Sequence, residues 1–175
     1  MDQCLRRCIQ KRLVENLSVK MFRGVGAIIV SENTGRVMTV LRSPKESHPN
    51  TWTFAGGRVE VEESNIDALR RELQEELNLT KIKKITPLHK YQSRSKDFVY
   101  ETYLVLVNKE FTPDLNWENT GYAWTDIDSL PSPLHPKTRQ MISSSRLVTK
   151  FKNFYQWVDK NNGSRDNTSS RQTNT

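Results

Sequence analysis

The sequence predicts an α/β fold, and three observations support that prediction. Two runs rich in β-branched residues, 25–31 and 36–42, are separated by a short turn and are typical of a β-hairpin. Residues 64–77 repeat apolar side chains every three or four positions, which indicates an amphipathic helix. Two further strand-like runs follow at 83–93 and 98–107. Strands on both sides of a helix are typical of one α/β domain.

Length and composition fit a single folded domain. The 175 residues fall within the roughly 100 to 200 residues of one domain, and 35% hydrophobic residues are enough for a core. No apolar run approaches the about 20 residues of a membrane helix, and residues 1–17 lack the apolar block of a secretory signal. We therefore expect a cytoplasmic protein that binds no membrane. Cys4 and Cys8 are the only cysteines and indicate neither a disulfide scaffold nor a zinc site.

The two ends of the chain carry its excess positive charge. Six basic and two acidic side chains fall within residues 1–23, and the same numbers fall within 146–175. We predict a basic amphipathic helix over 1–21, a domain over 22–160 and a disordered polar tail over 161–175, which has no apolar residue. Basic ends can attract nucleic acid or an acidic partner, but solvated helices are commonly basic, so nucleic acid is not the favoured partner.

The elements follow in order along the predicted domain. The turn at 32–35 closes the first hairpin, and the proline- and glycine-containing loop 43–62 holds at most a short strand at 52–54. After the helix at 64–77, Asn78 occupies a position suited to a left-handed cap. The strand at 98–107 is apolar on both faces, which predicts an inner position in the sheet.

The C-terminal part begins with a short strand. We expect that strand at 122–125, then a proline-rich linker and a helix near 137–144. Aromatic residues at helical spacing predict one more helix; they are Phe151, Phe154, Tyr155 and Trp157.

Three acidic side chains crowd one edge of the helix at 64–77. Glu72, Glu75 and Glu76 project within an arc of about 100° beside the apolar stripe. Glu72 and Glu76 are like charges four residues apart, and the last helical turn disfavours anions. A cation would compensate for both penalties. Carboxylates are hard oxygen ligands that suit Mg²⁺ or Mn²⁺, and a small set of them leaves positions for water and phosphate oxygens.

The residues around this helix resemble the Nudix box. The match runs from Gly57 through Glu63 to the segment 71–79, Arg-Glu-Leu-Gln-Glu-Glu-Leu-Asn-Leu. One fixed position departs from the pattern, because Asn78 stands where the family usually has glycine. Asparagine tolerates the left-handed conformation well, so the turn is preserved. The preceding segment 52–57 is also similar to the family's usual sequence, except that Ala55 replaces a common proline.

The resemblance implies both the fold and the chemistry. It implies an α/β/α sandwich around a mixed β-sheet over about residues 22–145, and cleavage of a nucleoside diphosphate linked to another group. The apolar spacing at both ends of the chain adds N- and C-terminal helical extensions to that fold. By the same resemblance, Arg71 would pair with Glu63 and hold the helix against its loop, and Gly57 would be structural. Mg²⁺, with Mn²⁺ as a substitute, would be held by the carbonyl of Gly56 and by three carboxylates, those of Glu72, Glu75 and Glu76.

A carboxylate is needed as general base, because water must attack a doubly anionic centre. Glu75 or Glu76 within the box are candidates. Outside it, Glu118 lies six residues before Trp124, which is similar to the placement of an additional acid in some family members, and we favour it. Glu101 is a weaker candidate, since a carboxylate in an apolar strand is more often paired structurally.

Substrate contacts and the substrate itself stay open. Arg42 and Arg58 flank the loop before the helix and are candidates for phosphate binding, while Trp117 and Tyr122 either stack on a base or pack structurally. Nucleotide sugars, dinucleotides and nucleoside triphosphates compete as substrates. Two alternatives are a catalytically silent module that binds nucleic acid or protein, and a hydrolase acting on RNA 5′ ends. The N-terminal helix offers a surface for a homodimer.

Overall fold

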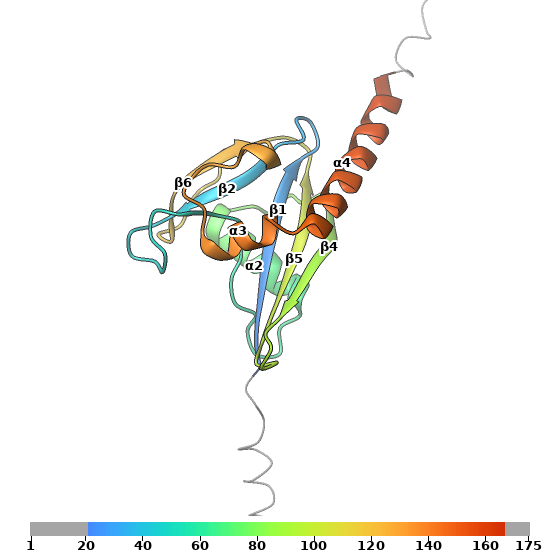
Figure 1. The fold of residues 1–175 in the computed structure, drawn as a ribbon. Coiled ribbons are helices and arrows are strands. Elements are labelled where there is room, and N and C mark those ends of the chain that lie inside the picture. The colour runs from blue at the N-terminus through green and yellow to red at the C-terminus, as the bar shows by residue number, and fades with distance from the viewer. Residues whose placement is uncertain (1–20, 167–175) are drawn as a thin grey trace, which may run out of the picture.

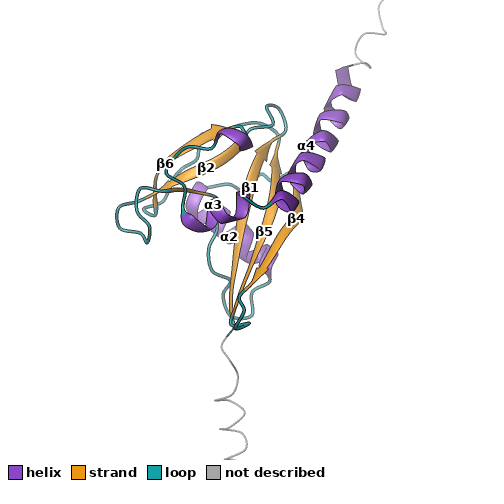
Figure 2. Cartoon of the chain, viewed as in Figure 1, coloured by secondary structure: helices purple, strands orange, loops and turns teal. Residues whose placement is uncertain are grey.

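The computed structural model describes residues 21–166, so the predicted helix at 1–21 lies almost entirely outside the described residues. The strands are β1 (Phe22–Ser31), β2 (Val37–Arg42), β3 (Trp52–Thr53), β4 (Lys84–Gln92), β5 (Phe98–Val107) and β6 (Asn119–Thr125). The helices are α2 (Asn65–Leu77), α3 (Pro136–Ile142) and α4 (Ser145–Asp166), with a short 3-10 turn at Ile127–Ser129. Figures 1 and 2 show their arrangement.

The sheet is mixed, as expected. Its order is β3-β2-β1-β5-β4, and β6 pairs with β2. Strands β1 and β5 run parallel over their whole length, from Phe22 opposite Phe98 to Ser31 opposite Val107, whereas β2 and β4 run antiparallel to them. The predicted hairpin and the inner position of the strand at 98–107 are therefore confirmed.

Strand β2 diverges from β1 and opens space beside it. Strand β1 pairs only with Val37 and Met38 of β2, and the segment that follows β3 takes over the free edge. The amides of Ala27 and Val25 donate to the carbonyls of Ala55 and Gly57, at 2.8 and 2.9 Å. These hydrogen bonds attach the start of the predicted box, at Gly57, to the edge of β1.

Alternate residues of the inner strands face two helical layers. Leu69, Leu73 and Leu77 of α2 are fully buried against one face of the sheet. Leu147 and Phe151 of α4 are buried against the other face (Figure 1). The predicted α/β/α sandwich is confirmed, because the period of two in β1 and β5 supplies apolar side chains to both layers.

Capping residues fix both ends of α2. The Ser64 hydroxyl accepts a hydrogen bond from the Asp67 amide at 3.1 Å, which begins the helix. Asn78 ends it in the left-handed conformation, with φ 53° and ψ 31°, and its amide donates to the Gln74 carbonyl at 2.9 Å. The predicted cap is therefore present, and α2 and its acidic side chains are fixed in register with the sheet.

The C-terminal helix predicted from its aromatic residues is present. Helix α4 runs from Ser145 to Asp166, past the predicted domain boundary at 160. The domain division and the polar tail stay predictions from the sequence. Residues 167–175 lie outside the described part of the chain. Within the described residues, no helix is long and apolar enough to cross a membrane.

Candidate active site

Arg71 joins α2 to the loop that precedes it. Its Nε and one Nη donate to the two Glu63 carboxylate oxygens at 3.0 and 3.1 Å, and the same Nη donates to the Arg58 carbonyl at 2.9 Å. These bonds lower the pKa of Glu63 below its ordinary range. The expected pairing of Arg71 with Glu63 is thus present, and its bidentate form fixes the angle between loop and helix.

Two glycines allow this loop to approach the sheet and the helix. Gly56 has φ +144°, and a β-carbon there would lie 2.2 Å from the Val25 carbonyl oxygen and 2.5 Å from the Gly26 α-carbon. A β-carbon on Gly57 would lie 2.5 Å from the Glu72 carboxylate. Gly56 is required by the close approach of backbone atoms and by its backbone conformation, whereas a β-carbon at Gly57 would displace the Glu72 carboxylate from its present position.

Glu76 is a buried carboxylate aimed at this loop. It is 4% exposed, and its two oxygens accept hydrogen bonds from the Gly56 amide and the Asn119 side-chain amide, both at 2.9 Å. Burial raises the pKa of Glu76 to about 7, and the negative charges of Glu72 and Glu118 add to that rise. Burial also raises the pKa of Glu72. Folding therefore disfavours the ionised forms of both carboxylates unless a positive charge lies beside them.

Glu118 joins the same region from the loop before β6. Its backbone carbonyl accepts a hydrogen bond from the Ser43 amide at 2.7 Å, which fixes the loop beside β2. Burial, followed by the charge of Glu46, raises the pKa of Glu118. Two of the box acids and the predicted outside acid are thus close enough to influence one another's ionisation.

The remaining acids have different surroundings. The Glu75 side chain is 56% exposed and accepts a hydrogen bond from Arg71 at 3.1 Å. Glu101 binds Lys90 at 3.1 Å and the Tyr103 hydroxyl at 2.7 Å, and the Tyr103 bond lowers its pKa. Glu101 is therefore a structurally paired carboxylate on β5.

The acids are not assembled around a single point. Among residues 21–166, no group of three or more His, Cys, Asp or Glu side chains is placed to hold a metal ion. Arg71 donates to both Glu72 and Glu75, which turns these carboxylates toward its guanidinium. The donor chemistry nevertheless fits a hard divalent cation, since Glu76 is a buried and Glu72 a half-buried carboxylate whose ionised forms such a cation would favour.

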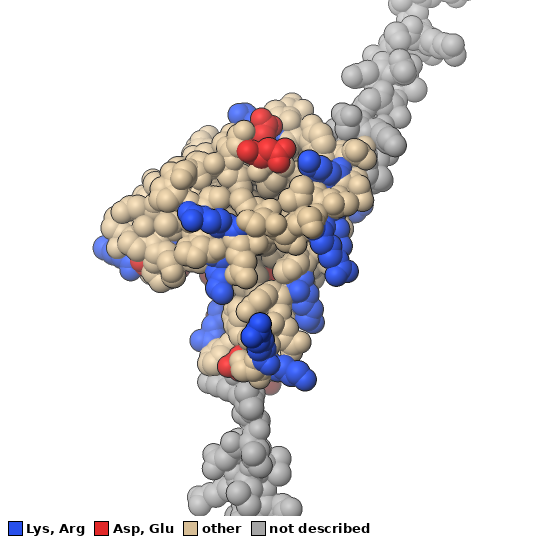
Figure 3. Space-filling view, viewed as in Figure 1, with Lys and Arg blue, Asp and Glu red and all other residues tan. Residues whose placement is uncertain are grey.

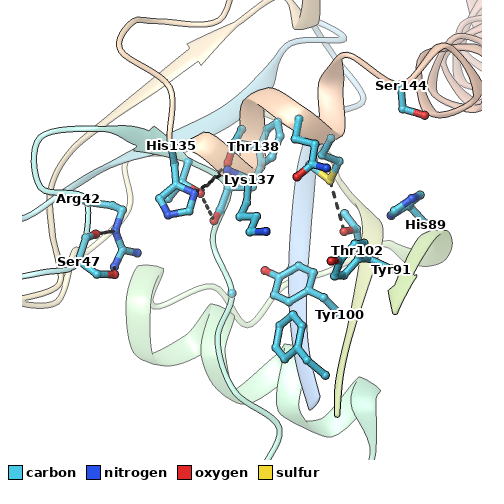
Figure 4. Close-up of a pocket in the computed structure, with 17 residues that line it drawn as sticks. Arg42, Ser47, His89, Tyr91, Tyr100, Thr102, His135, Lys137, Thr138 and Ser144 are labelled. Carbon is cyan, nitrogen blue, oxygen red and sulfur yellow. Dashed lines mark hydrogen bonds between the residues drawn. The ribbon is translucent and has the colours of Figure 1, made fainter. Parts of the chain in front are cut away.

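A cavity of about 500 Å³ reaches Gly56, whose amide binds the Glu76 carboxylate. It is enclosed by the loop that follows β2, by one face of β1, β5 and β4, and by α3 (Figure 4). Arg42 and Gly56 line it near the acids, and Arg42 donates to Glu46 at 2.7 Å and to the Ser47 carbonyl at 2.8 Å. The Arg42 guanidinium, which lines the cavity, is therefore fixed by its bonds to Glu46 and Ser47.

Other predicted contacts lie elsewhere. The Arg58 guanidinium lies 4.6 Å from the centroid of the Phe22 ring, and Arg58 is not among the residues that line the cavity. Trp117 is 66% exposed, and the Tyr122 hydroxyl lies 3.3 Å from that of Thr112. Neither aromatic side chain lines the cavity. Of the two predicted arginines, the structure brings only Arg42 to the site.

Sequence reasoning missed two residues of the site. Asn119, the first residue of β6, holds the second oxygen of Glu76, but a neutral amide at a strand end gives no charge or periodicity to detect. Tyr100 lines the cavity from the inner strand β5. Two glycines within the β-branched run of β1, Gly24 and Gly26, were the available signal, because an interior glycine often marks a close approach.

Comparisons with known proteins agree with this geometry. The NUDIX domain model matches residues 20–144. The chain is 34% identical over 114 residues to a nucleoside triphosphatase NudI of Escherichia fergusonii, covering 57% of this chain and 79% of the relative. It is 43% identical over 61 residues to a CTP pyrophosphohydrolase of Escherichia coli, covering 35% of this chain and 44% of that protein.

A solved structure shares the fold. The crystal structure of a MutT NUDIX hydrolase from Burkholderia pseudomallei aligns with a TM-score of 0.55 at 24% identity, covering 71% of this chain and 97% of that one. The box geometry, the family match and the relatives lead to one conclusion: the chain belongs to the Nudix family of hydrolases.

Proposed function

We propose that this Nudix hydrolase cleaves the pyrophosphate bond of a nucleoside triphosphate in a reaction that depends on a divalent metal. The buried carboxylate of Glu76 carries the proposal. A protein that only bound its ligand would gain nothing from burying this acid near Glu72 and Glu118, because burial and those two charges raise the pKa of Glu76 and disfavour its ionised form in the folded protein. The cost of burying Glu76 is offset if a divalent cation binds these carboxylates and an anionic substrate binds that cation.

The proposed metal site uses the oxygens already described. Glu72, Glu75, Glu76 and the Gly56 carbonyl would hold Mg²⁺, with Mn²⁺ able to substitute. The bound ion would neutralise phosphate charge and make water a better nucleophile. Arg71 would hold Glu72 and Glu75 near the site, since it already donates to both of them.

Protein side chains supply the remaining functions. Glu118 is proposed as the base that accepts a proton from the attacking water, and its raised pKa makes it a stronger base than an ordinary glutamate. Arg42 is proposed to bind a phosphate oxygen, because it lines the cavity and its positive charge reaches Glu118. Arg58 stays a weaker candidate, since its guanidinium stacks on Phe22.

The relatives favour nucleoside triphosphates over nucleotide sugars and dinucleotides. One relative is named a nucleoside triphosphatase and another a CTP pyrophosphohydrolase. The proposed products are a nucleoside monophosphate and pyrophosphate. A cytoplasmic location and a homodimer stay predictions from the sequence.

A substrate panel tests the proposal. The protein is incubated with each common ribo- and deoxyribonucleoside triphosphate, ADP-ribose and a dinucleoside polyphosphate, with Mg²⁺, Mn²⁺ or EDTA, and the products are separated by chromatography. We expect monophosphate and pyrophosphate from at least one triphosphate, with no turnover in EDTA. Glu76→Gln serves as the matched inactive control. Release of inorganic phosphate alone, or equal turnover in EDTA, would contradict the proposal.

One observation keeps RNA 5′ ends as a second candidate substrate. Burial lowers the pKa of His89, a cavity-lining residue, and the charges of Lys150 and Arg146 lower it further, so cations lie beside that end of the cavity. Figure 3 shows basic side chains over β4 and the start of α4. A 5′-triphosphorylated oligonucleotide added to the same panel separates this candidate from free nucleotides.

A further inference from the structure

One tyrosine lies flat across the inner strands where two glycines make room. Tyr100 of β5 is the register partner of Gly24 on β1. A β-carbon on Gly24 would lie 2.7 Å from the Tyr100 ring, and one on Gly26 would lie 2.4 Å from the Tyr100 hydroxyl oxygen. Both glycines therefore serve the placement of this ring, which spans from β5 over β1.

The ring directs its hydroxyl toward the acidic cluster. Gly26 borders Gly56, because a β-carbon on Gly56 would lie 2.5 Å from the Gly26 α-carbon, and both glycines line the cavity. The Gly56 amide in turn holds Glu76. Burial raises the pKa of the Tyr100 hydroxyl, and the charges of Glu76 and Glu72 raise it further. The hydroxyl therefore keeps its proton and is a hydrogen-bond donor near Gly26 and Gly56.

The opposite end of the cavity is aromatic. Tyr91 of β4 is the register partner of Tyr100, and the Phe98 ring lies 6.2 Å from Tyr100 and 6.4 Å from Tyr91, centroid to centroid. The Lys137 ammonium of α3 lies 5.7 Å from the Tyr91 ring centroid. All four side chains line the cavity, and Figure 4 shows Tyr100 between the Arg42 end and the Tyr91 end.

The cavity thus has a cation, Arg42, at one end and flat aromatic rings at the other, with Tyr100 between them. A nucleotide has the same division, since phosphates and base are joined by a sugar. Aromatic side chains stack on any base, and a hydroxyl donates its strongest hydrogen bonds to an anionic oxygen.

We propose that Tyr100 binds the nucleotide at this division: its hydroxyl donates a hydrogen bond to the phosphate attached to the sugar, and Tyr91 and Phe98 support the base. This inference rests on the proposed function and adds a specific nucleotide-binding residue outside the Nudix box. Tyr100 acts by binding the ligand, and no metal is required for its contact.

Binding measurements test the role of the hydroxyl. Tyr100→Phe keeps the ring and removes only the donor. Calorimetry in EDTA measures the affinities of the variant and of wild type for a nucleoside monophosphate and for the matching nucleoside. Both ligands carry the base of the best-cleaved triphosphate, or cytosine if none is cleaved. We expect monophosphate affinity to fall about tenfold or more and nucleoside affinity to stay constant. Tyr155→Phe, which removes a hydroxyl on α4 next to Gly35, is the matched control.

A second variant tests independently whether Gly26 makes room for the Tyr100 hydroxyl. Gly26→Ala places a methyl group against the Tyr100 hydroxyl, so it should weaken monophosphate binding in the wild-type background and do so less in Tyr100→Phe. Equal monophosphate affinity of Tyr100→Phe and wild type, equal losses for nucleoside and monophosphate, or no monophosphate binding by wild type would each overturn the inference. Wild-type turnover of triphosphates is scored separately, so failure of the proposed function is distinguishable from failure of this contact.

Discussion

Replacing Glu76 by glutamine separates activity from stability. The carboxylate is 4% exposed and accepts hydrogen bonds from the amides of Gly56 and Asn119. A glutamine side chain accepts the Gly56 bond with its oxygen, and rotation of the Asn119 amide lets the new amide donate to it. We therefore expect the fold to persist, while kcat falls by on the order of 10² or more because a proposed metal ligand is lost.

The same change should stabilise the metal-free protein at alkaline pH. A folded-state pKa of about 7 for Glu76, against 4.5 for an ordinary glutamate, corresponds to about 3 kcal/mol. Because the folded-state pKa is raised, the favourable contribution is complete below pH 4.5 and disappears as the pH rises through 7. Glu76→Gln avoids burying a charge, so it should exceed wild type by up to about 3 kcal/mol at pH 8.

Chemical denaturation in EDTA at pH 5 and pH 8, followed by circular dichroism, measures this difference. At pH 8 the Tm of Glu76→Gln should also be higher by about 6 to 12 °C. Glu75→Gln is the matched control, since that side chain is 56% exposed and its replacement should leave stability within about 0.5 kcal/mol. A Glu76→Gln protein less stable than wild type at pH 8, or a difference independent of pH, would refute the reasoning.

Three further predictions concern the surrounding residues. Arg71→Lys loses the bidentate contact with Glu63, so Mn²⁺ affinity measured by titration should fall by about tenfold or more; unchanged affinity would show that Arg71 does not orient the ligands. Asn78→Ala should lower stability by about 1 kcal/mol while Asn78→Gly does not, because φ is 53°; equal melting temperatures would argue against strain at this cap. Glu118→Gln should lower kcat by about 10² to 10⁴, and the raised pKa of Glu118 should place the acidic limb of the wild-type rate profile above the ordinary glutamate range. That limb should vanish in the variant, and a limb unchanged by the substitution would assign the base elsewhere.

Local patterns predicted the elements whose formation depends on local physics. The apolar spacing of Leu69, Leu73 and Leu77 set the buried face of α2, and the left-handed preference of Asn78 set its end. The motif also placed Arg71 against Glu63, since both lie within one loop-and-helix unit. Composition does not determine the end of α4, because polar residues continue a helix that earlier turns have already anchored.

Long-range proximity was beyond the sequence. Asn119 reaches Glu76 across 43 positions, and nothing in its neighbours marks it as a partner of a buried acid. Tyr100 is a site residue because β1 and β5 pair in a register that places its ring against Gly24 and Gly26, and a single sequence does not specify that register. The carboxylates themselves were predicted, but their present bonds to Arg71 depend on side-chain rotation that spacing does not specify.

Manganese binding tests the central claim most directly. Metal-free wild type and Glu76→Gln are titrated with Mn²⁺ and the free ion is followed by electron paramagnetic resonance, with Mg²⁺ as competitor. The account predicts that wild type binds Mn²⁺ at a site from which Mg²⁺ displaces it, and that Glu76→Gln loses this binding. Equal binding by both proteins, or wild-type hydrolysis that continues without any bound metal, would contradict it.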